Sequence, residues 1–300
     1  MCDDPAVDGG PARRVHPGAA RTEVIAHRGA SENEPEHTLA AYRRAIDVGA
    51  DVLECDVRLT ADGHLVCVHD RKVNRTSTGR GLVSTFELAQ LEGLDWGSWK
   101  RLPLDQGGPG SAEGIGGHSS ELPERVDDSD RSELLTLRRL LTEVRDADRP
   151  IRLAVETKHP TRYGALVERR LVDLLDEFGW AFPPPGVQPP VRMMSFSMLA
   201  IRRMRLIAPA IPLVLLMERV PVPFREGALP RSVVAAGVRI DTVRSHPKYV
   251  HKVHAQGRAV HVWTVDDLAD VDRCVHLGVE AIITNRPEAV LAHLANLGRR

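Results

Sequence analysis

Apolar positions change their spacing repeatedly along the chain, and this change separates short strand-like runs from longer helical segments. The helical segments are predicted at 37–49, 135–148, 163–179, 198–209, 247–257, 266–278 and 287–298, with a weaker helical pattern between about 219 and 236. The strand-like runs are predicted at 24–27, 52–59, 65–70, 151–158, 191–197, 212–218, 237–243, 259–265 and 280–285.

The alternation of strands and helices predicts a parallel sheet that is covered by helices. A doubly wound sheet would carry a glycine-rich GxGxxG loop after its first strand, but here residues 27–37 read HRGASENEPEH. A (β/α)8 TIM barrel needs eight strands, and nine runs are present if 65–70 is counted. We therefore predict an α/β protein with a (β/α)8 barrel, in which one run is irregular or paired outside the eight.

Two segments do not follow this alternation. Residues 1–22 are acidic, then rich in proline and glycine, and are interpreted as a flexible tail. Residues 101–133 contain the run GGPGSAEGIGGHSSE, which is too polar for a core and too long for an ordinary connection. Because the same alternation resumes afterwards, we interpret this stretch as an insertion in a single domain that covers 23–298.

Composition narrows the class of protein. The 300 residues carry 40 basic and 41 acidic side chains, a net charge of -1, which disfavours a nucleic-acid-binding role. The four scattered cysteines form no disulfide framework or zinc motif. No apolar run approaches the ~18 residues that span a membrane, and the N-terminus has no signal-peptide apolar region. The expectation is a cytoplasmic protein without stable membrane insertion.

Ionisable residues follow several of the predicted strands. Side chains alternate along a strand, so Glu54 and Asp56 share one face and Cys55 points to the other. Glu156 and Lys158 share a face for the same reason. In a barrel these strand ends converge on one mouth. Three carboxylates there repel one another, and a hard divalent cation with oxygen ligands would relieve the repulsion.

Two further strand ends carry His27 and His69, and histidine is suited to acid–base catalysis near neutral pH. Arg28 and Lys158 would face the same mouth and could bind a phosphodiester. The chain has only five lysines against 35 arginines, so a lysine at this position suggests that a compact ammonium is required. These residues indicate metal-assisted phosphoester chemistry without specifying a substrate.

The same residues resemble a known family. Residues 27–81, from HRGASENEPEHTLAAYRRAID to RKVNRTSTGRG, resemble the opening of the glycerophosphodiester phosphodiesterases, especially the actinobacterial members. The later blocks VETKHP, MSFS, VWTVDD and GVEAIITNRPE follow in the family's order, so that the resemblance covers about 23–292 without the insertion. It implies a phosphodiesterase-type barrel that hydrolyses glycerophosphodiesters, such as glycerophosphocholine or glycerophosphoethanolamine, to sn-glycerol 3-phosphate and an alcohol. Attack by the glycerol 2-hydroxyl would form a cyclic phosphate.

The resemblance also implies roles for eight residues. The ligands of one Mg²⁺ or Ca²⁺ ion would be Glu54, Asp56 and Glu156. The acid–base pair would be His27 and His69, with neither role assigned to either one. The substrate contacts would be Arg28 and Lys158 at the phosphate and Trp263 beside the glycerol or the leaving group.

Two positions differ from the commonest family pattern. Residues 35–38 read Pro-Glu-His-Thr where many members have Pro-Glu-Asn-Thr, which leaves the hydrogen bonds of His37 open. Asn285 stands where many members have aspartate.

Two other functions are kept as alternatives. One is a lysophospholipase D-type diesterase, whose acyl chain would need an apolar groove from Met193, Met198 or residues 220–224. The other is a catalytically inactive barrel that only binds a partner. A small-molecule substrate is the expected partner, and a homodimer is left open.

Overall fold

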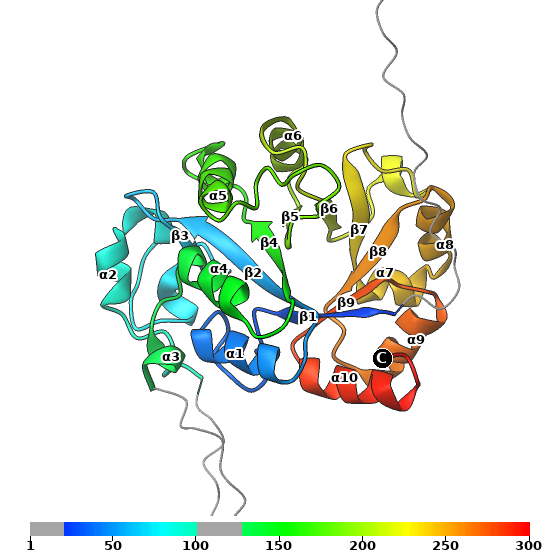
Figure 1. The fold of residues 1–300 in the computed structure, drawn as a ribbon, viewed down its shortest axis with the longest axis horizontal. Helices are drawn as coiled ribbons and strands as arrows, with labels where there is room; N and C mark the ends of the chain where they lie inside the picture. The colour runs from blue at the N-terminus through cyan, green and yellow to red at the C-terminus, as the bar shows by residue number, and fades with distance from the viewer. Residues whose placement is uncertain (1–20, 101–127) are drawn as a thin grey trace, which may run out of the picture.

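The computed structural model describes residues 21–100 and 128–300, and in this part of the chain eight parallel strands close into a barrel (Figure 1). The barrel strands are β1 (Glu23–His27), β2 (Val52–Leu59), β4 (Arg152–Thr157), β5 (Val191–Ser195), β6 (Leu213–Met217), β7 (Val233–Arg239), β8 (Ala259–Trp263) and β9 (Ala281–Thr284). Pairing of β1 with both β9 and β2 closes the barrel. The predicted (β/α)8 barrel is therefore confirmed.

The ninth predicted run forms β3 (Leu65–Cys67), which pairs antiparallel with β2 through Leu59 and Leu65. Residues 68–70 continue as a loop rather than as a strand. β2 and β3 thus form a hairpin, and β3 is not one of the eight barrel strands. This agrees with the prediction that one of the nine runs lies outside the eight.

Helices surround the barrel on its outer side (Figure 1). The helices are α1 (Leu39–Asp47), α2 (Leu88–Glu92), α3 (Asp128–Ser132), α4 (Leu137–Asp146), α5 (Leu166–Glu177), α6 (Met198–Ile207), α7 (Ile240–Ser245), α8 (Lys248–Ala255), α9 (Leu268–His276) and α10 (Pro287–Asn296). Several helices are preceded by an N-cap residue whose side chain accepts a hydrogen bond from a backbone N–H of the first turn. Thr38 does so for α1 and Ser197 for α6.

Two apolar layers stabilise the barrel. The larger layer lies between strands and helices and contains residues such as Leu53, Val155 and Leu171, all fully buried. The smaller layer fills the barrel interior and includes Ile25 and Met194. Because alternate strand residues face these two layers, the strands are apolar along much of their length, although Glu23, Arg152 and Arg192 carry charge at or near the N-terminal ends of β1, β4 and β5.

The sequence prediction was wrong between 219 and 243. The strand is β7 (Val233–Arg239), and the residues predicted to continue it form α7 (Ile240–Ser245). Ala235 and Ala236 of β7 favour a helix by propensity, but the barrel interior requires small side chains here. A Cβ on Gly237 would lie 2.4 Å from Leu216 Cδ2. Close packing in the barrel therefore overrides the helical propensity of alanine.

Most of the predicted tail and of the glycine-rich insertion lies outside the described residues. Thr22, assigned to the tail, is buried and donates a hydrogen bond to the carbonyl of Val279 at 3.1 Å. The last residues of the predicted insertion form the short helix α3. No helix in the described ranges is long and apolar enough to cross a membrane.

Candidate active site

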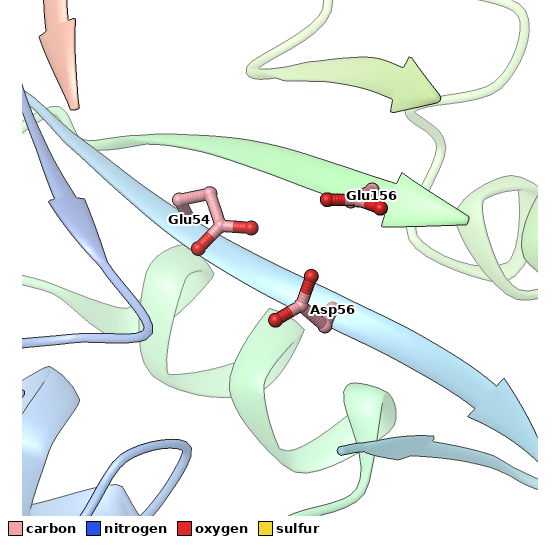
Figure 2. Close-up of side chains that lie close together, drawn as sticks. All are labelled: Glu54, Asp56 and Glu156. Carbon is pink, nitrogen blue, oxygen red and sulfur yellow. The ribbon is translucent and has the colours of Figure 1, made fainter. Parts of the chain in front are cut away.

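Three carboxylates meet on two neighbouring strands of the barrel, two of them along β2 and one near the C-terminal end of β4 (Figure 2). Glu54 and Asp56 lie two positions apart on β2, whereas Cys55 between them is buried in the layer beneath the helices. Glu156 on β4 is in register with Asp56. One oxygen from each carboxylate lies within 4.8 Å of the others, and the three residues are only 2%, 1% and 7% exposed. The alternation along the strands thus places them together.

The electrostatics of this cluster favour a bound cation. Burial raises the pKa of Glu54 well above its ordinary value, and the charge of Asp56 adds to the effect. Burial and Asp56 also raise the pKa of Glu156 to about 8. Burial acts in the same direction on Asp56, but nearby cations, Lys158 first, outweigh it and hold its pKa well below the usual range. A divalent cation would supply the charge that lets all three ionise together.

Lys158 and Arg28 lie against these carboxylates. Nζ of Lys158 donates to Oε1 of Glu156 at 2.7 Å and lies 2.9 Å from Oδ1 of Asp56. The backbone N–H of Arg28 donates to Oε2 of Glu54 at 2.9 Å, and its Nε lies 3.1 Å from Oδ2 of Asp56. Contact of either residue with a phosphate stays a prediction, but both are placed at the carboxylate cluster.

The turn after β1 orients Arg28. Its φ of 58° lies in the left-handed region, and Gly29 follows with a φ of 82°. A Cβ at Gly29 would lie 2.6 Å from the carbonyl carbon of Ala41 at the start of α1, so glycine is required for this close approach. The HRG sequence therefore forms a tight turn that fixes the arginine at the mouth.

His27, at the end of β1, has a defined tautomer. Its Nδ1 lies 2.7 Å from Oδ1 of Asn285. Nδ2 of Asn285 donates to Oδ2 of Asp266 at 2.7 Å, which fixes the orientation of the amide. The amide oxygen only accepts, so Nδ1 of His27 carries the hydrogen, and Nε2 has the lone pair. Burial and the charge of Arg28 lower the pKa of His27 to about 4, which keeps the imidazole neutral at pH 7.

His69 reaches the site from the loop after β3 and is held by a chain of charged residues. Its Nδ1 donates to Oδ1 of Asp70 at 2.7 Å. Arg75 donates to Oδ2 of Asp70 at 2.9 Å and makes two hydrogen bonds, of 2.7 and 2.8 Å, to Glu36. Glu36 also accepts a hydrogen bond of 3.0 Å from Arg28. This network connects His69 to Arg28, the arginine of the HRG turn.

The network keeps its carboxylates ionised. Hydrogen bonds from Arg75 lower the pKa of Asp70 to about 2. Burial would raise the pKa of Glu36, but hydrogen bonds from Arg75 and the charge of Arg28 lower it to about 2. Burial lowers the pKa of His69, and the charge of Asp56 opposes this shift. His69 therefore stays neutral more readily than an exposed histidine, although it lies beside an anion.

His37 makes the hydrogen bonds that the sequence left open. Its Nε2 lies 2.9 Å from Oδ2 of Asp56, and its Nδ1 lies 2.8 Å from the hydroxyl of Tyr42. That hydroxyl donates to the carbonyl of Glu54 at 3.0 Å. Because ionised Asp56 only accepts, Nε2 of His37 is the donor. His37 thus orients one of the clustered carboxylates.

A cavity of about 250 Å³ joins these groups. Seven of the eight predicted site residues line it: His27, Arg28, Glu54, His69, Glu156, Lys158 and Trp263. The eighth, Asp56, does not line the cavity but lies beside Glu54 and Glu156 through its carboxylate. Phe196 adds to the wall, edge-on to the Trp263 ring with centroids 5.5 Å apart. The structure therefore brings all eight predicted residues to one place.

Sequence analysis missed the residues that hold the histidines. Asp70 was visible beside His69, but no spacing in the sequence indicated Arg75 or Glu36 as its partners. Asn285 was noted only as a departure from a common pattern, and Asp266 was part of a matched block without a role. Phe196 likewise lay within a block and had no assigned contact.

Comparison with known proteins identifies a family that the chain matches along most of its length. Residues 27–289 match the model of the glycerophosphoryl diester phosphodiesterase family. A protein named probable glycerophosphodiester phosphodiesterase 1, from Mycobacterium tuberculosis H37Rv, is 45% identical over 90% of this chain and 92% of its own. A glycerophosphodiester phosphodiesterase from Caldanaerobacter subterraneus is 30% identical over 90% of this chain and 97% of its own.

Solved structures share the fold. An Oleispira antarctica phosphodiesterase, described in complex with the product sn-glycerol-3-phosphate, superposes with a TM-score of 0.73 at 23% identity and covers 92% of this chain and 97% of its own. A glycerophosphodiester phosphodiesterase from Agrobacterium tumefaciens superposes with a TM-score of 0.67 at 22% identity, over 90% of this chain and 99% of its own. The matched barrel, together with the sequence match across its length, shows that the chain belongs to the glycerophosphoryl diester phosphodiesterase family of phosphoric diester hydrolases.

Proposed function

We propose that this chain hydrolyses glycerophosphodiesters, such as glycerophosphocholine or glycerophosphoethanolamine, to sn-glycerol 3-phosphate and an alcohol. The observation that carries the proposal is the placement of His27 and His69 on the cavity that holds the carboxylate cluster. In both, Nδ1 is hydrogen-bonded, and Nε2 has no partner among residues 21–100 and 128–300. Two such imidazoles suit the two proton transfers of phosphodiester cleavage.

We further propose that Glu54, Asp56 and Glu156 hold one divalent cation, Mg²⁺ or Ca²⁺. Their carboxylate oxygens are suitable ligands for a hard cation. The raised pKa values of Glu54 and Glu156 also fit a site that holds a positive ion when both are ionised. When bound, the cation would neutralise charge on the phosphate and make phosphorus more electrophilic. Arg28 and Lys158 would orient the phosphate oxygens beside it, and Trp263 would bound the glycerol or the leaving group.

The environments of the two histidines suggest which is the base and which is the acid. His27 is kept neutral by burial and by Arg28, so its Nε2 can accept the proton of the glycerol 2-hydroxyl. As the 2-oxygen bonds to phosphorus, the bond from phosphorus to the leaving oxygen breaks. Burial lowers the pKa of His69, but Asp56 and the hydrogen bond to ionised Asp70 oppose this shift, so this imidazole can carry the proton that the leaving oxygen takes up. Water then opens the cyclic phosphate, with both proton transfers reversed, to give sn-glycerol 3-phosphate.

Release of sn-glycerol 3-phosphate from glycerophosphocholine tests the proposal, measured with Mg²⁺, with Ca²⁺ and after EDTA treatment. His27→Ala and His69→Ala should each lower kcat by about 10²- to 10⁴-fold, the usual value of acid–base catalysis. His251→Ala, at an exposed histidine of α8, is the matched control. Wild-type rates in either site variant, or full activity without metal, would contradict the assignment.

A 4-nitrophenyl diester of glycerol phosphate separates the two roles, because its leaving group needs no proton. His69→Ala should lose much less activity on this diester than on glycerophosphocholine. His27→Ala should lose activity on both, since the nucleophile is unchanged. The reverse pattern would exchange the two roles.

A lysophospholipid is the second substrate class to compare. Met193 is fully buried in the outer apolar layer and offers no groove, whereas Phe196 at the cavity is 42% exposed and Val222 in the segment after β6 is 69% exposed. Rates on lysophosphatidylcholine and glycerophosphocholine distinguish the two activities. No turnover of any diester with either metal would favour an inactive binding barrel.

A further inference from the structure

A second and larger cavity lies beside the active-site cavity. Its volume is about 1080 Å³, compared with about 250 Å³ for the first. It lies between the segment that follows β6 and the helices α7 and α8, which follow β7 in the yellow and orange part of Figure 1. Glu218 lines both cavities. A substrate that extends out of the first cavity on this side therefore enters the second.

Arg239 marks the boundary between the cavities. Its guanidinium carbon lies 5.8 Å from the centroid of the Trp263 ring, which lines the active-site cavity. It donates to Glu218 at 2.6 Å and to Asp241 at 2.9 Å. Both carboxylates on this side of the larger cavity are thus paired with Arg239, and Oδ1 of Asp241 also lies 3.2 Å from Nη1 of Arg244.

The rest of the larger cavity has an excess of positive charge. Its third carboxylate, Glu226, pairs with Lys252 at 2.9 Å. Three further cations line the cavity and have no ion pair with any residue in the described ranges: Arg219, Arg225 and Lys248. An anionic ligand would meet these side chains without displacing an existing partner.

Tyr249 gives an independent indication of a ligand. It lines this cavity, is only 5% exposed, and its hydroxyl has no hydrogen-bond partner within the described part of the chain. Burial raises the pKa of Tyr249 to about 12, so the hydroxyl is a donor at neutral pH. Buried hydroxyls without partners are uncommon in folded proteins. Because this oxygen has almost no accessible surface, a ligand oxygen would accept its hydrogen bond only after the tyrosine side chain shifts toward the cavity.

The cavity wall is fixed rather than formed by a loose loop. Gly227, in the segment after β6, has a φ of 81°, and a Cβ there would lie 2.3 Å from the carbonyl oxygen of Lys252 on α8. The segment therefore packs directly against the backbone of α8. A ligand would enter a site whose two walls are already in contact.

We propose that this cavity binds the leaving group and favours leaving groups that carry a phosphate of their own. The inference rests on the proposed function. The sn-glycerol 3-phosphate half of a substrate has a constant length, so only the leaving group can extend past Trp263 and Arg239. Unpaired cations and a buried hydroxyl donor suit a second phosphate, whereas they offer nothing to the cation of a choline group.

Two diesters with the same glycerol oxygen as leaving atom test this inference. One is glycerophosphoglycerol, and the other is bis(glycerophospho)glycerol, whose leaving group has an additional phosphodiester. The measured quantity is the ratio of kcat/KM for the second to that for the first, from released sn-glycerol 3-phosphate. Arg225→Gln with Lys248→Gln should lower this ratio about tenfold, because each lost contact is exposed and weak.

Arg202→Gln with Arg299→Gln is the matched control, since both are exposed arginines away from the cavity and unpaired within the described residues. It should leave the ratio unchanged. Tyr249→Phe should also lower the ratio while its Tm is equal to or above that of the wild type, because the deleted hydroxyl has no partner in the protein. A purely structural hydroxyl would leave the ratio unchanged.

The outcomes separate the two proposals. Wild-type turnover of both diesters with a ratio that neither cavity variant changes would overturn this inference alone. Absence of sn-glycerol 3-phosphate release from either diester, with Mg²⁺ and with Ca²⁺, would overturn the proposed function and this inference with it.

Discussion

Asn285 holds His27 from the opposite end of the chain: Oδ1 of Asn285 accepts a hydrogen bond of 2.7 Å from Nδ1 of a histidine 258 residues away. Closure of the barrel between β1 and β9 makes this contact possible. Asp266 fixes the amide in turn, so the proton position on His27 is set by residues that follow β8 and β9. Because the amide of Asn285 has no charge, it stabilises the imidazolium less than a carboxylate would, and the pKa of His27 stays low.

Asn285→Asp should therefore shift the pH dependence of activity. A carboxylate beside Nδ1 stabilises the imidazolium and raises the pKa of His27 from its value of about 4. Since His27 is the proposed base, the acid limb of kcat/KM should move to higher pH, by about one to two units. The profile is measured at saturating metal. Ser31→Ala is the control, because Ser31 also contacts Oδ1 of Asn285, and an unshifted limb in Asn285→Asp would contradict the role of His27.

Arg75 should matter for substrates that need a protonated leaving group. It fixes Asp70, which in turn orients His69, and Arg75→Gln removes that support. We expect kcat on glycerophosphocholine to fall about 10- to 100-fold, part of the usual contribution of a general acid. On a 4-nitrophenyl diester the fall should be much smaller. Equal losses on both substrates would show that Arg75 acts on binding or folding and not through His69.

Much of the fold follows from local pattern. Eight of the nine predicted strands overlap the observed ones at nearly the same residues, because buried parallel strands are apolar runs with polar C-terminal ends. The exception is β7, where Ala235 and Ala236 fit a helix by propensity. The close approach of Leu216 on the neighbouring strand β6, which no local pattern contains, favours the strand.

The candidate site likewise contains residues that local sequence pattern could place and residues that it could not. Glu54 and Asp56, or Glu156 and Lys158, could be placed on one face because the period of a strand is two. Arg75 ends a short 3-10 helix, Val73–Arg75, and Asp266 lies in a loop, so no strand or helix periodicity relates these side chains to their neighbours. Their roles depend on three-dimensional contacts that sequence spacing does not encode.

Glu36 should contribute acid-sensitive stability. Its pKa is lowered from 4.5 to about 2, so the folded state holds the carboxylate more readily than the unfolded chain does. This contribution is complete above the unfolded pKa and is lost as the pH falls from about 4.5 to about 2. At neutral pH its size is on the order of 3 kcal/mol.

Urea unfolding of the wild type and Glu36→Gln at pH 7, 5 and 3 measures the contribution. The difference in free energy of unfolding should be largest at pH 7 and 5 and should shrink at pH 3. Glu92→Gln, at an exposed residue of α2, is the control. A difference that does not vary with pH would mean that Glu36 stabilises the fold without its charge.

Glu54→Gln should have opposite effects on stability with and without metal. Burial and Asp56 raise the pKa of Glu54 well above its ordinary value, so in metal-free protein its ionisation destabilises the fold as the pH rises above the unfolded pKa. An uncharged amide of the same shape removes that cost, and the metal-free variant should have a higher Tm than the metal-free wild type. At a Mg²⁺ or Ca²⁺ concentration of 100 Kd, the wild type should gain about 2.7 kcal/mol, or roughly 5 to 10 °C in Tm. Glu54→Gln should gain much less, and an equal metal-induced rise in both proteins would place the cation elsewhere.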